Sequence, residues 1–249
     1  MAFRVIFTMF CGFLLKMGVS TVFPVELLKE EIHGVACYLG VIGALYGIVL
    51  AFVIFVVWDQ FNKVQTGIFL EGAALEDMCH TATFISDAEA AYKIKVAVRE
   101  YIAISVADEA TFLARGEMCP AATKAFLKVS DAVREVEIKK PKDQIVFGEL
   151  FTALSRVNNA RDARLGISSA RIPGALWHLI LLFSVSIIGG FLFLGIRLTL
   201  LANMMVGIIA GCIVFLLSVI QDIDNPFGGQ WSVSYNPFVE VSSRLKITR

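Results

Sequence analysis

The sequence predicts an all-α membrane protein with four spans and a helical water-soluble domain. Hydrophobic residues make up 57% of the 249 residues, whereas a soluble domain has about 45–50% apolar residues. The mean hydropathy is +0.73. Three long windows contain no Asp, Glu, Lys or Arg: 36–57, 172–196 and 198–221. The intervening region, 58–171, is charged and has apolar residues at helical spacing.

Each uncharged window is long enough for one membrane span, because about 20 apolar helical residues cross a hydrocarbon core of ~30 Å. A fourth apolar segment, about 5–25, is interrupted by Lys16. This segment is either a retained span or a cleaved signal peptide. It has no small-residue cleavage site, and its apolar character resumes after Lys16, so a retained span is favoured.

The distribution of basic residues predicts the orientation, because short loops rich in Lys and Arg stay in the cytoplasm. The loop 24–34 carries only Lys29 among three Glu residues, and the loop between the last two spans carries only Arg197. The opposite side carries Arg4, Lys63, Arg164, Arg171 and the basic C-terminal residues. We therefore expect a multi-pass protein of the cytoplasmic (inner) membrane, with both termini and the central domain in the cytoplasm.

The second span is predicted to continue beyond the membrane as one helix. Neither a Pro nor a turn cluster follows Trp58, and the helical pattern persists to about Thr83. Small residues at steps of three and four indicate close helix packing: Gly40, Gly43, Gly47 and Ala51. A second set of positions, at steps of three and four, follows an adjacent face: Ala44, Ile48, Phe52 and Phe55. We interpret this helix as the wall of a pore, with ordinary packing as the alternative.

The central region reads as a series of helices. Ser86 with Glu89 resembles a capping box, and the helix that follows should end near Arg115, with Gly116 as a left-handed cap. Pro120 suits the first turn of the next helix, which runs to about Val136.

A last central helix is expected from about Asp143, and it ends in a basic stretch, 156–164. These arginines either line a vestibule or pair with acidic residues of neighbouring helices, and we favour the structural pairing. The paired acids Glu76-Asp77 and Asp108-Glu109 are expected to face water.

The last span should end in a turn formed by Asp222, Asp224, Asn225, Pro226, Phe227 and Gly228. Pro226 cannot continue a helix. Two carboxylates can offer oxygen ligands to calcium, but Asp222 and Asp224 alone are too few for a tight site. The five cysteines form no C-x-x-C pair. We expect no metal site, and a cytoplasmic tail from 222 to 249 whose end, 242–249, is mobile and basic.

The sequence argues against an enzyme. It contains no nucleophile elbow, phosphate loop or H-E-x-x-H motif, and its three histidines, His33, His80 and His178, are scattered. We therefore expect neither catalytic residues nor a cofactor. The formal net charge of zero gives no indication of nucleic-acid binding.

The order of elements resembles the bestrophin-like family of prokaryotic membrane proteins, within the bestrophin superfamily. Two spans precede a helical region and two more spans, and Asn-Pro-Phe-Gly follows the last one. The stretches that carry the resemblance are 45–52 with Trp58 to Phe61, Glu71 to Leu75, Arg161 to Leu165, Ile172 to Trp177, and Asp224 to Gly228. They extend over about 34–233.

The resemblance implies a pentamer in which the second span of each subunit lines an axial pore for small inorganic ions. The positions that match the hydrophobic neck of bestrophins are Ala44, Ile48 and Phe52. Ala44 departs from this pattern because it is small, and Val53 stands where many prokaryotic members have an arginine. Calcium-gated bestrophins have a run of acids after Asn-Pro-Phe-Gly. Here Gly229 to Ser232 follows, so we expect no strong calcium clasp.

Together these observations predict a homo-oligomeric ion channel, with a pentamer expected. The alternative is a non-conducting membrane scaffold or sensor whose cytoplasmic helices bind a partner. The expected organisation is two spans in 1–57, a cytoplasmic helical domain in 58–171, two spans in 172–221 and the tail in 222–249. Its expected partners are the lipid bilayer, ions and further copies of the same chain.

Overall fold

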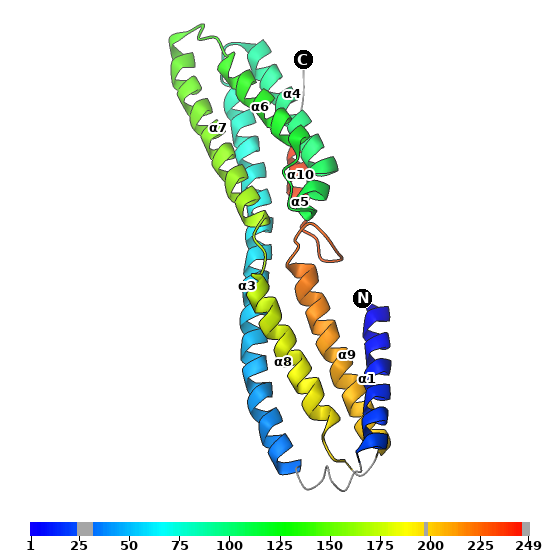
Figure 1. Cartoon of the computed structure of the whole chain (residues 1–249). Coiled ribbons are helices and arrows are strands. Elements are labelled where there is room, and N and C mark those ends of the chain that lie inside the picture. Colours follow the sequence, from blue (N-terminus) through cyan, green and yellow to red (C-terminus); the bar gives the residue numbers. More distant parts are fainter. Residues whose placement is uncertain (24–31, 197–198, 246–249) are drawn as a thin grey trace. The chain divides into compact units, whose positions relative to one another are not determined.

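The computed structural model describes residues 1–23, 32–196 and 199–245, and in these ranges the chain is helical and contains no strand (Figure 1). The prediction of an all-α fold is confirmed for these residues. Three parts of the orientation argument lie outside them: residues 24–31 with Lys29, Arg197, and the C-terminal residues 246–249. The helices are α1 (Ala2–Val22), α3 (Ile32–Ala82), α4 (Ala88–Ile104), η1 (Ser105–Glu109), α5 (Ala110–Ala114), α6 (Pro120–Arg134), α7 (Pro141–Ser168), α8 (Gly174–Leu192), α9 (Thr199–Ile223) and α10 (Asn236–Arg244).

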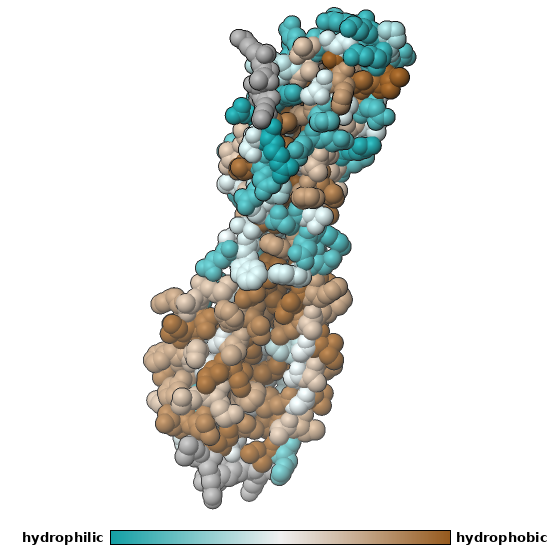
Figure 2. Space-filling view, turned by 180° about the vertical axis from the view of Figure 1, so that it is seen from behind, coloured by the Kyte–Doolittle hydropathy of each residue, from teal (hydrophilic) through white to brown (hydrophobic). Residues whose placement is uncertain are grey.

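The chain divides into two compact units, and the first comprises residues 1–58 and 172–224. It contains α1, α8, α9 and the first part of α3. These four helices are long and apolar enough to cross a membrane, and the surface of this unit is mostly hydrophobic (Figure 2). The four expected spans therefore correspond to four apolar helices. α8 begins two residues into its uncharged window, because Pro173 occupies its N-cap, and it ends at Leu192, before the window does.

Helix α1 packs closely against α9 (Figure 1). A Cβ atom added to Gly207 would lie 2.8 Å from the carbonyl oxygen of Met9, and one added to Gly12 would lie 3.2 Å from the Cβ of Ala210. Lys16 is buried, and its Nζ donates to the carbonyl oxygens of Leu192 and Leu194, at 2.6 and 3.0 Å. A cation is favourable among the unpaired carbonyls at a helix C-terminus. These contacts pack α1 into the first unit, and its retention in place of cleavage stays a prediction.

The second unit comprises residues 59–171 and 225–249. The remainder of α3 packs with α4, α6, α7 and α10 around one hydrophobic core. Fully buried core residues include Ile68, Leu75, Ile94, Val98, Tyr101, Val129, Leu150 and Phe238. Helix α10 contacts α3 in this core through Phe238, whose ring packs on Gly72. A Cβ atom added to Gly72 would lie 3.4 Å from that ring.

Most helix ends in the second unit agree with the sequence prediction. α3 ends at Ala82, Gly116 has a left-handed φ of 75° after α5, and Pro120 begins α6. Helix α7 begins at Pro141, two residues before the expected start. Asp143 lies in its first turn, and its carboxylate accepts hydrogen bonds from the backbone N–H groups of Lys139 and Lys140. Asp143 therefore belongs to the cap of α7.

The prediction of Ser86 as an N-cap is wrong by one residue. Asp87 caps α4, because its Oδ1 accepts hydrogen bonds from the N–H groups of Glu89 and Ala90, at 3.1 and 3.3 Å. The N–H of Ser86 donates instead to Oδ1 of Asp143, at 3.1 Å. Ser and Asp are comparable capping residues. A contact 57 positions away in the sequence decides between them.

The expectation of a mobile end is also wrong for residues 242–244, which belong to α10. This helix is short and begins with Pro237 in its first turn. Arg244 forms ion pairs with Glu76 of α3 and with Glu240, at 3.2 and 2.9 Å. Nine residues give too few helical repeats for a clear sequence signal, and packing on the core stabilises such a helix more than its own propensity.

Candidate functional site

One face of α3 in the first unit is apolar and exposed. Its large side chains are spaced by three or four residues, so they share one side of the helix: Val41, Leu45, Ile48, Phe52 and Phe55. The exposed fractions of Ile48, Phe52 and Phe55 are 67, 60 and 69%. We call these five residues the α3 apolar face. Tyr46, Leu50, Val53 and Val57, by contrast, are buried against the unit.

The structure places the residues predicted for the neck as follows. Ile48, Phe52 and Phe55 lie on the α3 apolar face, and Ala44 is also exposed. Among the described residues, no other helix of the chain covers them. Their position is compatible with a pore, a lipid contact or a contact between copies, so the pore-lining role stays a prediction.

The small residues of α3 that were predicted to pack make no close helix contact within the described part of the chain. A Cβ atom added to Gly40, Gly43 or Gly47 would meet nothing within 4 Å, and Ala51 is exposed. Their predicted packing role therefore needs a partner outside the chain. The close approach inside the chain uses Gly207 and Gly211 of α9, which the sequence analysis did not single out. Their G-x-x-x-G spacing was an available signal.

Helix α3 becomes polar shortly after the apolar face. Asp59 and Lys63 form an ion pair of 2.6 Å within one turn, and both side chains are substantially exposed. Such an exposed pair contributes little to stability. It does bring charge next to the apolar face along the helix.

A buried cluster of charged groups connects α3, η1 and α7 inside the second unit. The Nε of Arg164 donates to Oε2 of Glu71 at 2.6 Å, and its Nη1 lies 2.8 Å from Oε2 of Glu109. The hydroxyl of Tyr101 donates to Oε1 of Glu71. All four side chains are at most 1% exposed. We call Glu71, Tyr101, Glu109 and Arg164 the buried charge cluster.

The electrostatics of this cluster keep its donors protonated. Burial opposes the charge of Arg164, but Glu71 and Glu109 outweigh it and raise the pKa of the guanidinium well above its ordinary value. Burial, together with Glu71, raises the pKa of Tyr101 well above its ordinary value. The pKa of the nearby Tyr235 is also raised, mainly by burial. Tyr235 lies with its hydroxyl 3.4 Å from Glu109.

Backbone geometry helps to assemble the buried charge cluster. Glu109 closes the π-helical turn η1, and a π turn shifts the register of the residues around it. Helices α3 and α7 approach closely at this cluster. A Cβ atom added to Gly67 of α3 would lie 3.1 Å from the Cβ of Arg164 on α7. The cluster thus forms where three helices, α3, α4 and α7, meet a π turn.

The sequence analysis anticipated only part of this cluster. Structural pairing of the basic stretch is confirmed, because Arg164 pairs with Glu71 and Arg156 pairs with Asp77 at 3.1 Å. The expectation that Glu109 faces water is wrong, since the π turn and the pairing with Arg164 bury it. Glu71 shares its helical spacing with buried Ile68 and Leu75, which was a usable signal for a buried acid.

The predicted turn after α9 has a structural role in each unit. In the first, Oδ1 of Asp224 accepts a hydrogen bond from the N–H of Ile172 at 2.9 Å. In the second, Asn225 accepts from Nη2 of Arg171 at 3.2 Å and donates to the carbonyl of Ala114 at 3.0 Å.

The rest of the turn is tightly folded. The N–H of Gly228 donates to the carbonyl of Asn225, and a Cβ added to Gly228 would lie 2.8 Å from Nδ2 of Asn225. Pro226 accepts from the N–H of Val233, and Phe227 packs its ring on Tyr235. Asp222 lies in the last turn of α9. No group of three or more His, Cys, Asp or Glu side chains in the described ranges can hold a metal ion.

A family model named the Bestrophin-like domain matches residues 6–238, which is most of the chain. The chain belongs to the bestrophin-like family. The resemblance found in the sequence is therefore confirmed, and the match includes α1, the α3 apolar face, the buried charge cluster and the turn after α9. A search of curated proteins gave no match.

Solved structures show the same fold as this bestrophin-like chain. A point variant of a bacterial bestrophin homologue from Klebsiella pneumoniae has a TM-score of 0.76 at 13% identity, covering 97% of this chain and 99% of its own. Two further variants from Klebsiella pneumoniae give TM-scores of 0.74 and 0.73 at 12 and 14% identity. Each of these covers 97% of this chain, and the matched shares of their own chains are 95 and 97%.

Proposed function

We propose that this bestrophin-like chain is the subunit of a homopentameric ion channel in the cytoplasmic membrane. Ions move passively through an axial pore lined by α3 of each copy. The observation that carries the proposal is the α3 apolar face, which is uncharged, continuous over four helical turns and uncovered by other described residues of its own chain. Family membership supports a fold of this class without establishing conduction for this chain.

The α3 apolar face suits a hydrophobic constriction. Rings of Ile48, Phe52 and Phe55 contributed by several copies leave a narrow apolar passage, and such a passage can gate by dewetting. Ala44 removes bulk from one end of this passage, so the tightest part is formed by Ile48 and Phe52. Asp59 and Lys63 then add oppositely charged groups beyond Phe55, and their mutual pairing limits the net field that either exerts on an ion.

Assembly of the pore also requires a contact between copies. Gly40, Gly43 and Gly47 offer a small surface with open space around it. Small residues allow membrane helices to approach closely, so these glycines are the proposed contact with a neighbouring subunit. In this arrangement residues 1–57 and 172–221 contribute four spans, and residues 58–171 form a cytoplasmic domain with the tail, 222–249. Both termini are cytoplasmic.

The proposal is tested by reconstituting purified protein into liposomes, together with a mass measurement of the oligomer in detergent. A pentamer that carries ion flux above that of protein-free vesicles is the expected result. Vesicles should be assayed with several anions and cations, over a range of pH and voltage. A monomer or dimer without flux under all these conditions would exclude the channel and favour the scaffold or sensor.

A further inference from the structure

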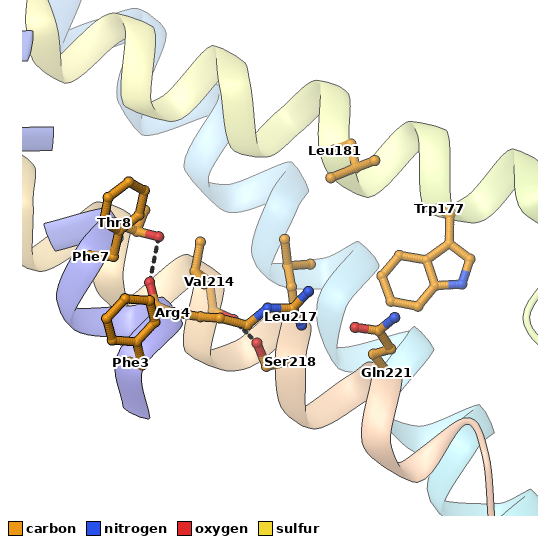
Figure 3. Close-up of a pocket in the computed structure, with 10 residues that line it drawn as sticks. All are labelled: Phe3, Arg4, Phe7, Thr8, Trp177, Leu181, Val214, Leu217, Ser218 and Gln221. Carbon is orange, nitrogen blue, oxygen red and sulfur yellow. Dashed lines mark hydrogen bonds between the residues drawn. The ribbon is translucent and has the colours of Figure 1, made fainter. Parts of the chain in front are cut away.

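The first unit contains an open groove of about 710 Å³ between α1, α8 and α9 (Figure 3). Its volume is in the range of ~300–1,000 Å³ that is common for small-molecule sites. The residues that line it are Phe3, Arg4, Phe7, Thr8, Trp177, Leu181, Val214, Leu217, Ser218 and Gln221. None of them belongs to the α3 apolar face or to the buried charge cluster.

The groove is polar at one end and apolar deeper along the helices. Arg4 lies in the first turn of α1, Trp177 in the first turn of α8 and Gln221 in the last turn of α9. One turn inward lie Phe7 and Leu181, and Val214 lies two turns inward on α9. The same gradient, from a polar head to apolar chains, characterises a phospholipid at the edge of the hydrocarbon region.

Arg4 supplies the charge at the polar end. In Figure 3 its side chain extends from α1 toward α9, on the side where Trp177 and Gln221 lie. Within the described residues its guanidinium forms no ion pair. Guanidinium binds phosphate oxygens well because its N–H donors form a planar fork. The amide of Gln221 adds a further donor, and the indole ring of Trp177 is favourable at headgroup level.

The apolar end is open to the surroundings. The side chains of Phe7 and Leu181 are 59 and 47% exposed. In a helix that lies in a membrane, such side chains contact acyl chains. A free anion would use only the polar end, whereas a lipid uses the whole groove.

We propose that this groove binds one anionic phospholipid per subunit, with its phosphate on Arg4 and Gln221 beside the ring of Trp177, and its acyl chains on Phe7, Leu181 and Val214. The site is independent of ion conduction, and it exists whether or not the protein forms a channel. Its specificity comes from charge, because a zwitterionic phosphatidylcholine headgroup carries its own cation and gains less from Arg4.

The test is native mass spectrometry of the full chain, after incubation with equal amounts of phosphatidylglycerol and phosphatidylcholine in detergent. Wild type should retain phosphatidylglycerol roughly fivefold over phosphatidylcholine, which corresponds to the ~1 kcal/mol that one cation contributes near anionic lipid. Arg4→Gln should abolish this preference, and Arg4→Lys should keep part of it. Lys63→Gln, which removes an ion-paired cation outside the groove, is the matched control and should bind as wild type.

A second measurement locates the lipid. The protein has three tryptophans, and the double variant Trp58→Phe, Trp231→Phe keeps only Trp177 as the fluorescent tryptophan. In this variant, brominated phosphatidylglycerol should quench the fluorescence of Trp177 more than brominated phosphatidylcholine does. Equal retention and quenching by both lipids, or an Arg4→Gln variant that behaves as wild type, would overturn the proposal. Displacement of the lipid by inorganic phosphate would also overturn it, in favour of a free-anion site. If Arg4→Gln instead lowered the oligomer mass with an unchanged lipid count, the groove would be a contact between copies.

Discussion

The guanidinium of Arg164 is completely buried, with its Nε 2.6 Å from Oε2 of the equally buried Glu71. This pair joins α7 to α3 inside the second unit, and Glu109 adds a second carboxylate at 2.8 Å. Removing one partner of a buried ion pair is costly because the remaining charge has neither water nor a counter-charge. The pair therefore makes the orientation of α3 dependent on α7.

The first prediction concerns this pair. Arg164→Met should lower the free energy of unfolding by about 3–5 kcal/mol, because two carboxylates lose their cation. Arg156→Gln is the matched control on the same helix. Its ion pair with Asp77 is exposed, so the loss should be below about 1 kcal/mol. Denaturant unfolding of the purified protein, followed by circular dichroism, measures both. Adding Glu71→Gln to Arg164→Met should restore part of the loss, and equal effects of the two single variants would contradict the assignment.

The second prediction concerns the contact between α1 and α9. Gly207→Ala should destabilise the protein by about 1–3 kcal/mol, because the new methyl group overpacks a backbone contact. The obstacle is the carbonyl oxygen of Met9 at 2.8 Å, which moves only if the helices separate. The control is Gly189→Ala on α8, where an added Cβ meets nothing within 4 Å. Thermal melts in detergent compare the variants. A Gly207→Ala protein as stable as the control would mean that α1 does not pack here.

The third prediction tests the proposed pore. Phe52→Ala should increase ion flux severalfold in liposomes, because a smaller side chain widens and wets a hydrophobic constriction. Val185→Ala removes an equally exposed apolar side chain from α8 and should leave flux unchanged. The oligomer mass of both variants is measured in parallel. Loss of flux together with loss of the oligomer in Phe52→Ala would identify Phe52 as a contact between copies, and unchanged flux through an intact oligomer would contradict a pore-lining role.

The fourth prediction concerns pH. Burial opposes ionisation of Asp143, but hydrogen bonds from Ser86, Lys139 and Lys140 outweigh it and lower the pKa of its carboxyl. A lowered folded-state pKa stabilises the protein above the unfolded value of about 3.9, and this contribution is lost as the pH falls through the folded-state pKa.

Asp143→Asn should accordingly lower the Tm by several degrees at pH 7, and the difference from wild type should disappear in acid, below the lowered pKa. Asp131→Asn serves as a control, because Asp131 is exposed on α6 and lies 3.9 Å from Arg134. Thermal melts from pH 7 down to about pH 2, well below the unfolded carboxyl pKa of about 3.9, supply the measurement. A pH-independent difference between Asp143→Asn and wild type would contradict this explanation.

The sequence by itself determined the features that depend on local physics. Runs of about 20 uncharged residues require a hydrocarbon solvent, so the apolar helices were predictable without tertiary information. The same holds for α3 continuing beyond Trp58, the left-handed Gly116 and the start of α6 at Pro120. The order of short motifs along the chain also identified the family.

Only the tertiary structure decided features that depend on distant residues. Asp87 caps α4, and the neighbouring Ser86 donates its N–H to the distant Asp143. Glu109 is buried because a π turn brings it to Arg164, 55 positions along the chain. Gly207 is a packing residue because α1 lies against it, whereas Gly40, Gly43 and Gly47 of α3 have open space. In each case the side chain alone permits two environments, and the free energy of pairing or close packing with a remote residue selects one of them.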